Sequence, residues 1–167
     1  MNVLIVFYSL NGHVRFLSEM IAENFNPAST DTVELKLEKE LPESIFRRNL
    51  LAAREFLFNG KPKLNNKPFD FSKYDLIFLG TPIWGTITPA MNTLLSENRI
   101  SKKKIAFFTS CDGGSPNRAY SKMEKLLVDN HIIGKINFVN PEPQDIDNIR
   151  KRVKEWINSI IDYRGKK

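Results

Sequence analysis

Apolar residues gather in five runs along the chain, and each run has the length of a β-strand. The predicted strands cover residues 3–8, 32–37, 75–80, 104–109 and 136–139. The first run is continuously apolar, which is typical of a strand covered on both faces. The second alternates apolar with polar residues, as strands near the edge of a sheet do. The pattern therefore predicts a sheet in which the first strand is central.

Between and after these runs, apolar residues recur every three to four positions. This spacing predicts helices over residues 12–26, 44–58, 89–98, 116–130 and 146–160, with a polar loop over 62–72. Strands that alternate with helices favour a doubly wound α/β fold, because right-handed crossovers place successive helices on the two faces of a parallel sheet. The sequence contains no repeat or linker, so we expect residues 1–167 to form a single domain.

Three loops directly follow three of the predicted strands: residues 9–14, 81–85 and 110–114. In an open parallel sheet the loops at the carboxyl ends of the strands line one crevice, and ligands bind where the strand order reverses. The sequence therefore predicts one site assembled from these three loops.

The first loop connects a buried strand to a helix, so the N–H groups at the helix start lack partners and attract an anion. Gly12 lets the backbone pass close to such a group, and Ser9 and Asn11 offer side-chain hydrogen bonds. His13 or Arg15 would add positive charge. The loop is a candidate phosphate site, with an ordinary strand-to-helix turn as the alternative interpretation.

In the second loop, Pro82 stiffens the exit from the strand and Trp84 stands beside Gly85. A tryptophan in a loop at a strand end can cover a flat heterocycle, because its ring buries a wide apolar area at little conformational cost. The alternative is that Trp84 packs against the protein itself. Trp156 lies at helical spacing in the last predicted helix, so we interpret it as a packing residue.

The third loop combines polar residues with glycines, whose backbone can approach and hydrogen-bond the polar edge of a ring. These residues are Ser110, Asp112, Gly113 and Gly114. Cys111 lies among them and is the one cysteine of the chain. Because it has no second cysteine to pair with, we interpret it as a small residue that fills space beside a ligand, with a redox thiol as the alternative.

Missing motifs exclude several other functions. The chain lacks the glycine fingerprint of dinucleotide-binding folds, the P-loop and the Gly-x-Ser-x-Gly turn of hydrolases. The first strand ends without the acidic pair of a receiver domain or the cysteine of a small phosphatase. One cysteine and two distant histidines make neither a zinc cage nor a helical zinc site, so we expect no bound metal.

The chain of 167 residues carries a net charge of +6, which favours acidic partners or anionic ligands. No nucleic-acid-binding motif accompanies the charge, so we interpret the basic clusters as solvated faces and expect no nucleic acid partner. The longest apolar run is too short to form a transmembrane segment. Because residue 1 leads straight into a strand without a secretion signal, we expect a cytoplasmic location.

Taken together, the three loops resemble those of the flavodoxin-like family. The most specific match is residues 74–85, which are similar to the family's third strand and ring-contacting loop. The resemblance implies a five-stranded sheet in the order 2-1-3-4-5 between two layers of helices, with flavin mononucleotide (FMN) as the cofactor. It places the phosphate at the first loop, one side of the isoalloxazine ring at the second, and the ring's pyrimidine edge at the third. The FMN-binding residues that it implies are Ser9, Asn11, Gly12, His13, Val14, Thr81, Pro82, Ile83, Trp84, Gly85, Ser110, Cys111, Asp112, Gly113 and Gly114.

The chain departs from the family at three points. Asn11 and Val14 stand where the phosphate loop usually carries hydroxyl residues, which removes a neutral hydrogen bond worth about 0.5–1.5 kcal/mol while backbone donors remain. The third loop has no aromatic residue to cover the second face of the ring, and Tyr120 in the next predicted helix is the aromatic that could swing over it. The chain is also basic, whereas electron-carrier flavodoxins are strongly acidic.

These departures favour an FMN-dependent oxidoreductase whose open ring face admits a nicotinamide or a quinone for hydride transfer. Its redox partners would be NAD(P)H, a quinone or an acidic redox protein. We assign no catalytic acid, base or nucleophile. Two alternatives remain open at this point: a one-electron carrier, and a binding module that kept the fold and lost the cofactor.

Overall fold

The computed structural model describes residues 1–39 and 61–162 of the chain. The strands in this part are β1 (Val3–Phe7), β2 (Thr30–Glu34), β3 (Leu76–Pro82), β4 (Lys104–Cys111) and β5 (His131–Val139). The α-helices are α1 (His13–Ala22), α3 (Pro89–Glu97), α4 (Asn117–Leu126) and α5 (Ile146–Asp162), with short 3-10 turns at Pro27–Ser29 and Pro143–Asp145. None of these helices is both long and apolar enough to span a bilayer. The predicted helix over residues 44–58 lies outside the described residues.

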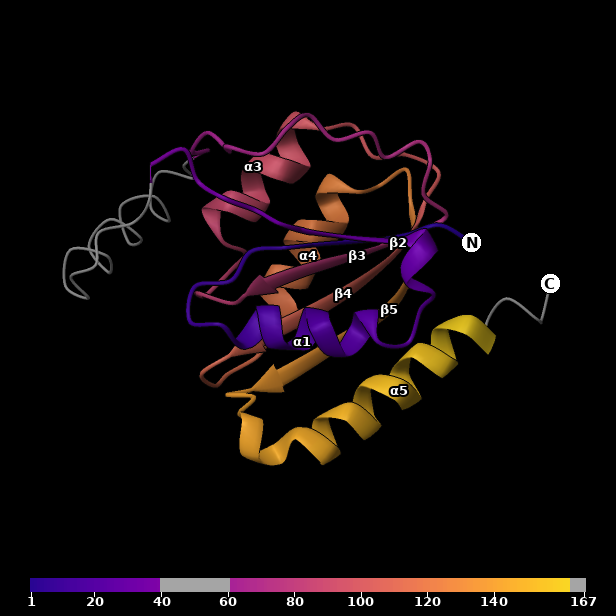
Figure 1. Ribbon diagram of the computed structural model, residues 1–167. Coiled ribbons are helices and arrows are strands. Elements are labelled where there is room, and N and C mark those ends of the chain that lie inside the picture. The colour runs from indigo at the N-terminus through magenta and orange to yellow at the C-terminus, as the bar shows by residue number, and fades with distance from the viewer. Residues whose placement is uncertain (40–60, 163–167) are drawn as a thin grey trace.

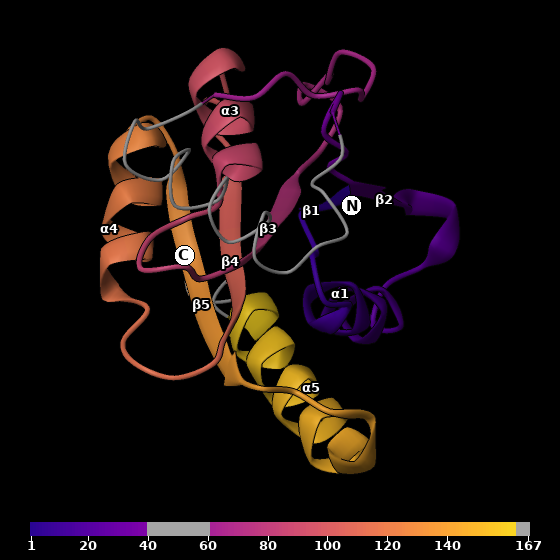
Figure 2. The ribbon, with the colours of Figure 1, turned by 90° about the vertical axis from the view of Figure 1, so that its left-hand side faces the viewer.

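The strands form one parallel sheet in the order β2-β1-β3-β4-β5, which confirms the predicted doubly wound α/β fold. Helices α1 and α5 cover one face and α3 and α4 the other (Figure 1), and Figure 2 shows the same separation from the side. Successive side chains of a strand point to opposite faces. On β3, Ile77 and Leu79 pack in the core under α3 and α4, whereas Leu76 and Phe78 pack under α1 and α5. Burial on both faces explains why the central strands are continuously apolar.

The second strand begins two residues before its predicted range of 32–37 and ends three residues before the end of that range, because its ladder with β1 runs from Thr30 to Glu34. The chain then leaves the sheet, and Leu37 forms an antiparallel bridge with Leu64. That contact lies in the predicted polar loop over 62–72, where Phe71 is also buried. The loop is therefore partly a core segment, because its apolar side chains pack in the core under α3 and α4.

Near the other edge of the sheet, α4 ends at Leu126 rather than at residue 130, and β5 begins five residues before residue 136. The side chain of Asn130 occupies the connection. Its amide group donates to the Ile100 carbonyl at 2.7 Å, and its oxygen accepts the N–H of Lys103 at 3.0 Å. The start of β5 escapes sequence analysis because most of this edge strand is half-buried and Gly134 interrupts its apolar pattern.

Candidate functional site

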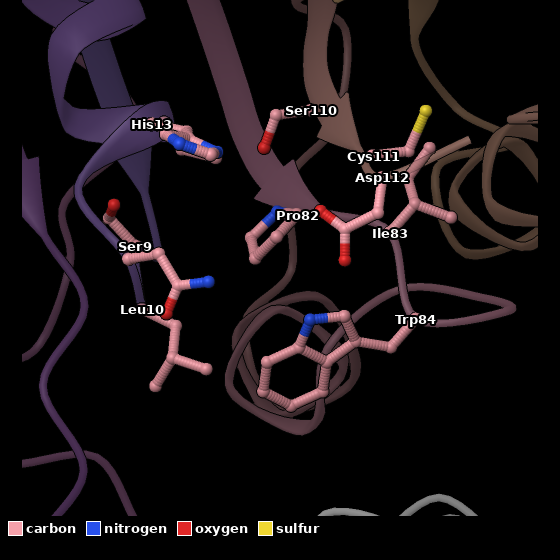
Figure 3. Close-up of a pocket in the computed structure, with 11 residues that line it drawn as sticks. Ser9, Leu10, His13, Pro82, Ile83, Trp84, Ser110, Cys111 and Asp112 are labelled. Carbon is pink, nitrogen blue, oxygen red and sulfur yellow. The ribbon is translucent and has the colours of Figure 1, made fainter. Parts of the chain in front are cut away.

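The carboxyl ends of β1, β3 and β4 carry three loops that meet around one cleft. The cleft is lined by Ser9, Leu10, Asn11, His13, Val14, Pro82, Ile83, Trp84, Ser110, Cys111 and Asp112 (Figure 3). The strand order reverses beside β1, so the cleft occupies the place at which doubly wound sheets bind ligands.

Most residues predicted for the site line this cleft. Those that do not are Thr81, Gly12, Gly85, Gly113 and Gly114. The four glycines instead shape the backbone of the loops, with φ angles between 73° and 151°. Leu10 lines the cleft although it was not among the predicted residues, and its position between two predicted residues of the same loop is the signal that could have found it.

The first loop turns into α1 at Gly12, whose φ of 87° lies in the left-handed region that favours glycine. His13 and Val14 then open the helix, and their N–H groups have no acceptor within it. The Ser9 hydroxyl accepts the N–H of Arg15 at 3.2 Å, which leaves its own proton available to an acceptor in the cleft. The first turn of α1 contains no acidic residue. This corner therefore presents hydrogen-bond donors and positive potential to an anion.

The two basic side chains near this corner differ in what they contact. Arg15 forms a bidentate ion pair with Glu34 at the end of β2, with N–O distances between 2.7 and 3.2 Å. Its side chain does not line the cleft, whereas that of His13 does. Figure 3 shows His13 and Ser9 on the side of the cleft opposite Trp84. The structure thus distinguishes two basic side chains that the sequence left as equivalent alternatives.

The second loop is a tight turn that carries Trp84 to the cleft. Ile83 pairs antiparallel with Ile87 across the turn, and the N–H of Trp84 donates to the Thr86 carbonyl at 3.0 Å. Gly85 between them has a φ of 73°. The indole packs partly against the core under α3 and α4, and the rest of the ring borders the cleft (Figure 3). The Trp84 ring therefore both packs against the protein and borders the cleft, so each of the two interpretations from the sequence holds for part of it.

Thr81 was predicted among the binding residues but is fully buried outside the cleft. Its hydroxyl donates to the Pro82 carbonyl at 3.1 Å and lies 3.0 Å from the hydroxyl of Thr88, just before α3. Strand alternation explains this position, because Thr81 follows Ile77 and Leu79 on the face that α3 covers. Thr81 therefore fixes the second loop to the start of α3, and its side chain does not line the cleft.

The third loop is joined to the second by the backbone, because the N–H of Ile83 donates to the Ser110 carbonyl at 2.8 Å. The Cys111 side chain is buried, and its sulfur accepts the amide N–H of Asn137 at 3.3 Å. Figure 3 shows this sulfur pointing away from the cleft, whereas the carboxylate of Asp112 points into it. This placement favours the space-filling interpretation of Cys111 over that of an exposed redox thiol.

Tyr120 does not lie over the cleft, contrary to the alternative raised from the sequence. Its ring is buried and stacks on Phe107 with a centroid distance of 6.0 Å. Its hydroxyl lies 3.0 Å from that of Thr109, whose oxygen lies 2.9 Å from the side-chain oxygen of Asn137. Burial raises the pKa of the Tyr120 hydroxyl above its ordinary value. Tyr120 is therefore a core residue that supports the end of β4.

The lining residues suit a ligand with an anion at one end and a flat ring at the other. Backbone N–H groups, the Ser9 hydroxyl and the Asn11 amide converge on the side of the cleft formed by the first loop. The opposite side offers the Trp84 indole and the backbone of the third loop. Among the described residues, no three His, Cys, Asp or Glu side chains come together in a way that could hold a metal ion.

Solved structures share this architecture. A flavoprotein from Lactobacillus acidophilus, crystallised in complex with FMN, is 21% identical, with 88% of this chain and 97% of that one covered and a TM-score of 0.71. A protein from Bacteroides eggerthii is 16% identical over 96% of this chain and 98% of its own, with a TM-score of 0.77. Oxidised flavodoxin 2 from Bacillus cereus is 18% identical over 98% and 99% of the two chains, with a TM-score of 0.55. At these identities the likeness shows the fold.

The family comparison covers nearly the whole sequence. A family model described as Flavodoxin matches residues 2–160, a range that includes all three loops of the cleft. The strand order, the position of the cleft at the end of β1 and this match agree with one another. The chain therefore belongs to the flavodoxin family.

Proposed function

We propose that the chain binds FMN in this cleft and acts as a redox protein. The observation that carries the proposal is the convergence of three loops on one cleft, with the start of α1 on one side and Trp84 on the other. The first loop would hold the phosphate, and Trp84 would lie against the isoalloxazine ring. Membership of the flavodoxin family and the FMN complex of the Lactobacillus acidophilus flavoprotein support this assignment.

When bound, FMN supplies the hydride or electron transfer chemistry, and the residues of this chain bind and orient it. The N–H groups at the start of α1 and the Ser9 hydroxyl would fix the phosphate. Trp84 would exclude water from one ring face. The third loop, fastened to the second by the Ile83 to Ser110 hydrogen bond, would present its backbone to the edge of the ring.

We further propose an oxidoreductase that takes hydride from NAD(P)H and passes electrons to a quinone or an acidic redox protein. The supporting observation is that nothing aromatic in the third loop can cover the second ring face, and Tyr120 is held in the core by Thr109 and Phe107. A face left open would admit a nicotinamide or a quinone. The net charge of +6 favours acidic protein partners.

FMN binding is tested by titrating the apoprotein with FMN and following the flavin fluorescence. Stacking of a base on an aromatic side chain is worth about 1–3 kcal/mol, so Trp84→Ala should weaken binding by roughly 5- to 150-fold. Trp84→Phe keeps an aromatic ring and should lose less affinity, which makes it the matched control. A wild-type protein that fails to bind FMN would instead identify a binding module without the cofactor.

The catalytic proposal needs a separate experiment, because a one-electron carrier would bind FMN equally well. We expect the FMN-loaded protein to oxidise NADH or NADPH steadily when a quinone is supplied as acceptor. A loaded protein that does not turn over with either nicotinamide, and whose potentiometric titration resolves two well-separated one-electron steps, would be a carrier.

A further inference from the structure

The helix α4 has an apolar side and a basic side. The residues buried against the core are Ala119, Tyr120 and Met123. Arg118, Lys122 and Lys125 follow one another at spacings of four and three residues, so their side chains lie along one side of the helix. We call these three basic residues the α4 stripe. The described residues that line a shallow hollow on this side are Asn117, Arg118, Ser121, Lys122 and Lys125.

The charges at the two ends of the stripe are not compensated within the part of the chain that the structure describes. Arg118 and Lys125 are exposed, and neither makes a hydrogen bond or ion pair with another described residue. The acidic residue of α4, Glu124, forms an ion pair with Lys135 on β5. Arg118 also lies in the first turn of α4, where the helix dipole favours a carboxylate over a basic side chain. Helix stability therefore does not account for the position of Arg118.

The stripe begins beside the third loop of the cleft. The N–H of Asn117 donates to the Ser115 hydroxyl at 3.3 Å, so α4 starts directly where this loop ends. The Tyr120 hydroxyl, 3.0 Å from that of Thr109, joins the same end of the helix to the end of β4. Figure 2 shows α4 on the outer side of the sheet, reached through the loop that leaves β4. A surface that includes Arg118 is therefore next to the rim of the cleft.

We propose, resting on the FMN assignment above, that the α4 stripe is the docking surface for a small acidic electron-acceptor protein. A standard protein interface buries about 800 Å² on each partner, which is wider than one helix. A partner seated on the stripe would therefore also cover the third loop and come close to the cleft. In each transfer one electron leaves the reduced flavin and enters the redox centre of the partner, and no covalent bond forms or breaks.

The chemistry of the stripe favours a protein over other anionic partners. The described residues of the hollow include no aromatic side chain on which a nucleic-acid base could stack, and no apolar side chain that could enter a membrane. Their basic groups instead suit carboxylates on a protein surface. Opposite charges on two such surfaces speed association, by about 10- to 1,000-fold at low salt.

Stopped-flow mixing of the reduced, FMN-loaded protein with an oxidised haem protein measures this docking as a second-order rate. The acidic probe is a soluble b-type cytochrome, and basic cytochrome c is the probe of opposite charge. At an ionic strength of about 0.1 M, Arg118→Glu combined with Lys125→Glu should reduce the acidic probe about tenfold more slowly than the wild type. The difference should shrink toward about 1 M salt, which screens the charges. Reduction of basic cytochrome c should not slow down.

The matched control is Lys151→Glu combined with Lys154→Glu. Both lysines are exposed on α5, on the other face of the sheet (Figure 1), and the control changes the net charge by the same amount. Charges more than about 10 Å away are largely screened at this ionic strength, so the rate with the acidic probe should change by less than about threefold. Arg118→Gln combined with Lys125→Gln adds no carboxylates and should give a rate between those of the wild type and the charge reversal. Circular dichroism and flavin absorbance confirm that each variant is folded and loaded.

The outcomes separate this proposal from the one on which it rests. Equal rates for the wild type and the α4 reversal, or equal slowing by the α4 and α5 reversals, refute the docking surface while FMN binding stands. An α4 reversal that loses binding to a DNA duplex or to vesicles of anionic phospholipid, with an unchanged cytochrome rate, refutes it as well. If the wild type binds no FMN, the proposed function fails. Calorimetric titration of the FMN-free protein with the acidic cytochrome then decides the surface: binding that the α4 reversal abolishes retains it, and no binding refutes it.

Discussion

Gly80 leaves room for a ring of the neighbouring strand, and an alanine there would not fit. Gly80 on β3 pairs with Phe108 on β4. A Cβ atom added at Gly80 would lie 2.1 Å from Cζ of Phe108 and 2.4 and 2.7 Å from the two Cε atoms. Ordinary contact begins at 3.4 Å, so the atoms must separate by 3.4 − 2.1 = 1.3 Å. The Phe108 ring is fully buried in the core under α1 and α5.

We therefore expect Gly80→Ala to lower the free energy of unfolding by about 1–3 kcal/mol, the usual cost of overpacking a core. The backbone of Gly80 is not in the left-handed region, so without the clash an alanine would stabilise the strand by about 0.4–1 kcal/mol. The sign of the measured change thus tests the steric argument. For a domain of this size the loss corresponds to a fall in Tm of roughly 2–12 °C.

Urea unfolding followed by circular dichroism measures the effect, and a double-mutant cycle with Phe108→Leu provides the control. The smaller side chain should relieve the clash, so the double variant should be more stable than the sum of the two single changes predicts. FMN affinity should fall as well, because the Gly80 carbonyl accepts the N–H of Tyr8 at the root of the first loop. A Gly80→Ala variant as stable as the wild type, or strictly additive with Phe108→Leu, would refute the reasoning.

Other substitutions test contacts at both ends of the sheet. Gly12→Ala should cost about 1–2 kcal/mol in urea unfolding, because an L side chain is strained at a φ of 87°, and an equally stable variant would contradict the role of this turn. Thr81→Val removes the hydroxyl beside Thr88 and should cost about 1 kcal/mol and weaken FMN binding, whereas Thr81→Ser should not. The hydrogen bond from Tyr74 holds the pKa of Asp31 below its ordinary value, so this bond stabilises the fold at neutral pH and stops doing so as the pH falls through that lowered pKa. Tyr74→Phe should accordingly be less stable than the wild type at pH 7 and equal to it in strong acid, and a gap that persists in acid would contradict this.

The central strands could be predicted from the sequence because burial on both faces leaves a continuous apolar run. The cleft could be located because its three loops directly follow these runs. The orientation of single side chains was harder to predict from the sequence. Thr81 follows Ile77 and Leu79 at alternate positions, a spacing that already indicates burial under a helix. Tyr120 and Met123 likewise share a buried helical stripe. For both Thr81 and Tyr120, strand or helix periodicity indicates a buried side chain, and this was better evidence of the side chain's position than closeness to a loop of the cleft.

The partner of Arg15 could not be predicted in the same way. Its ion pair joins two residues 19 positions apart, and it depends on the end of β2 lying beside the start of α1. The extent of β2 was itself misjudged, since the alternation of residues 32–37 continues past the last residue that pairs with β1. Which of the two side chains, Arg15 or His13, faces the cleft is therefore decided by the tertiary structure.

The backbone ladder of the sheet continues past the strands to the base of the cleft. Tyr8 donates to Gly80 at 3.0 Å, Ile83 to Ser110 at 2.8 Å, and Asn140 to the carbonyl of Cys111 at 3.0 Å. These amide hydrogens exchange with solvent only when the sheet edge opens, whatever occupies the cleft. The amides at the start of α1 have no such partner in the helix, so their exchange rates report directly on an occupant. The amides of Tyr8, Ile83 and Asn140 therefore provide an internal reference against which exchange at the start of α1 can be measured.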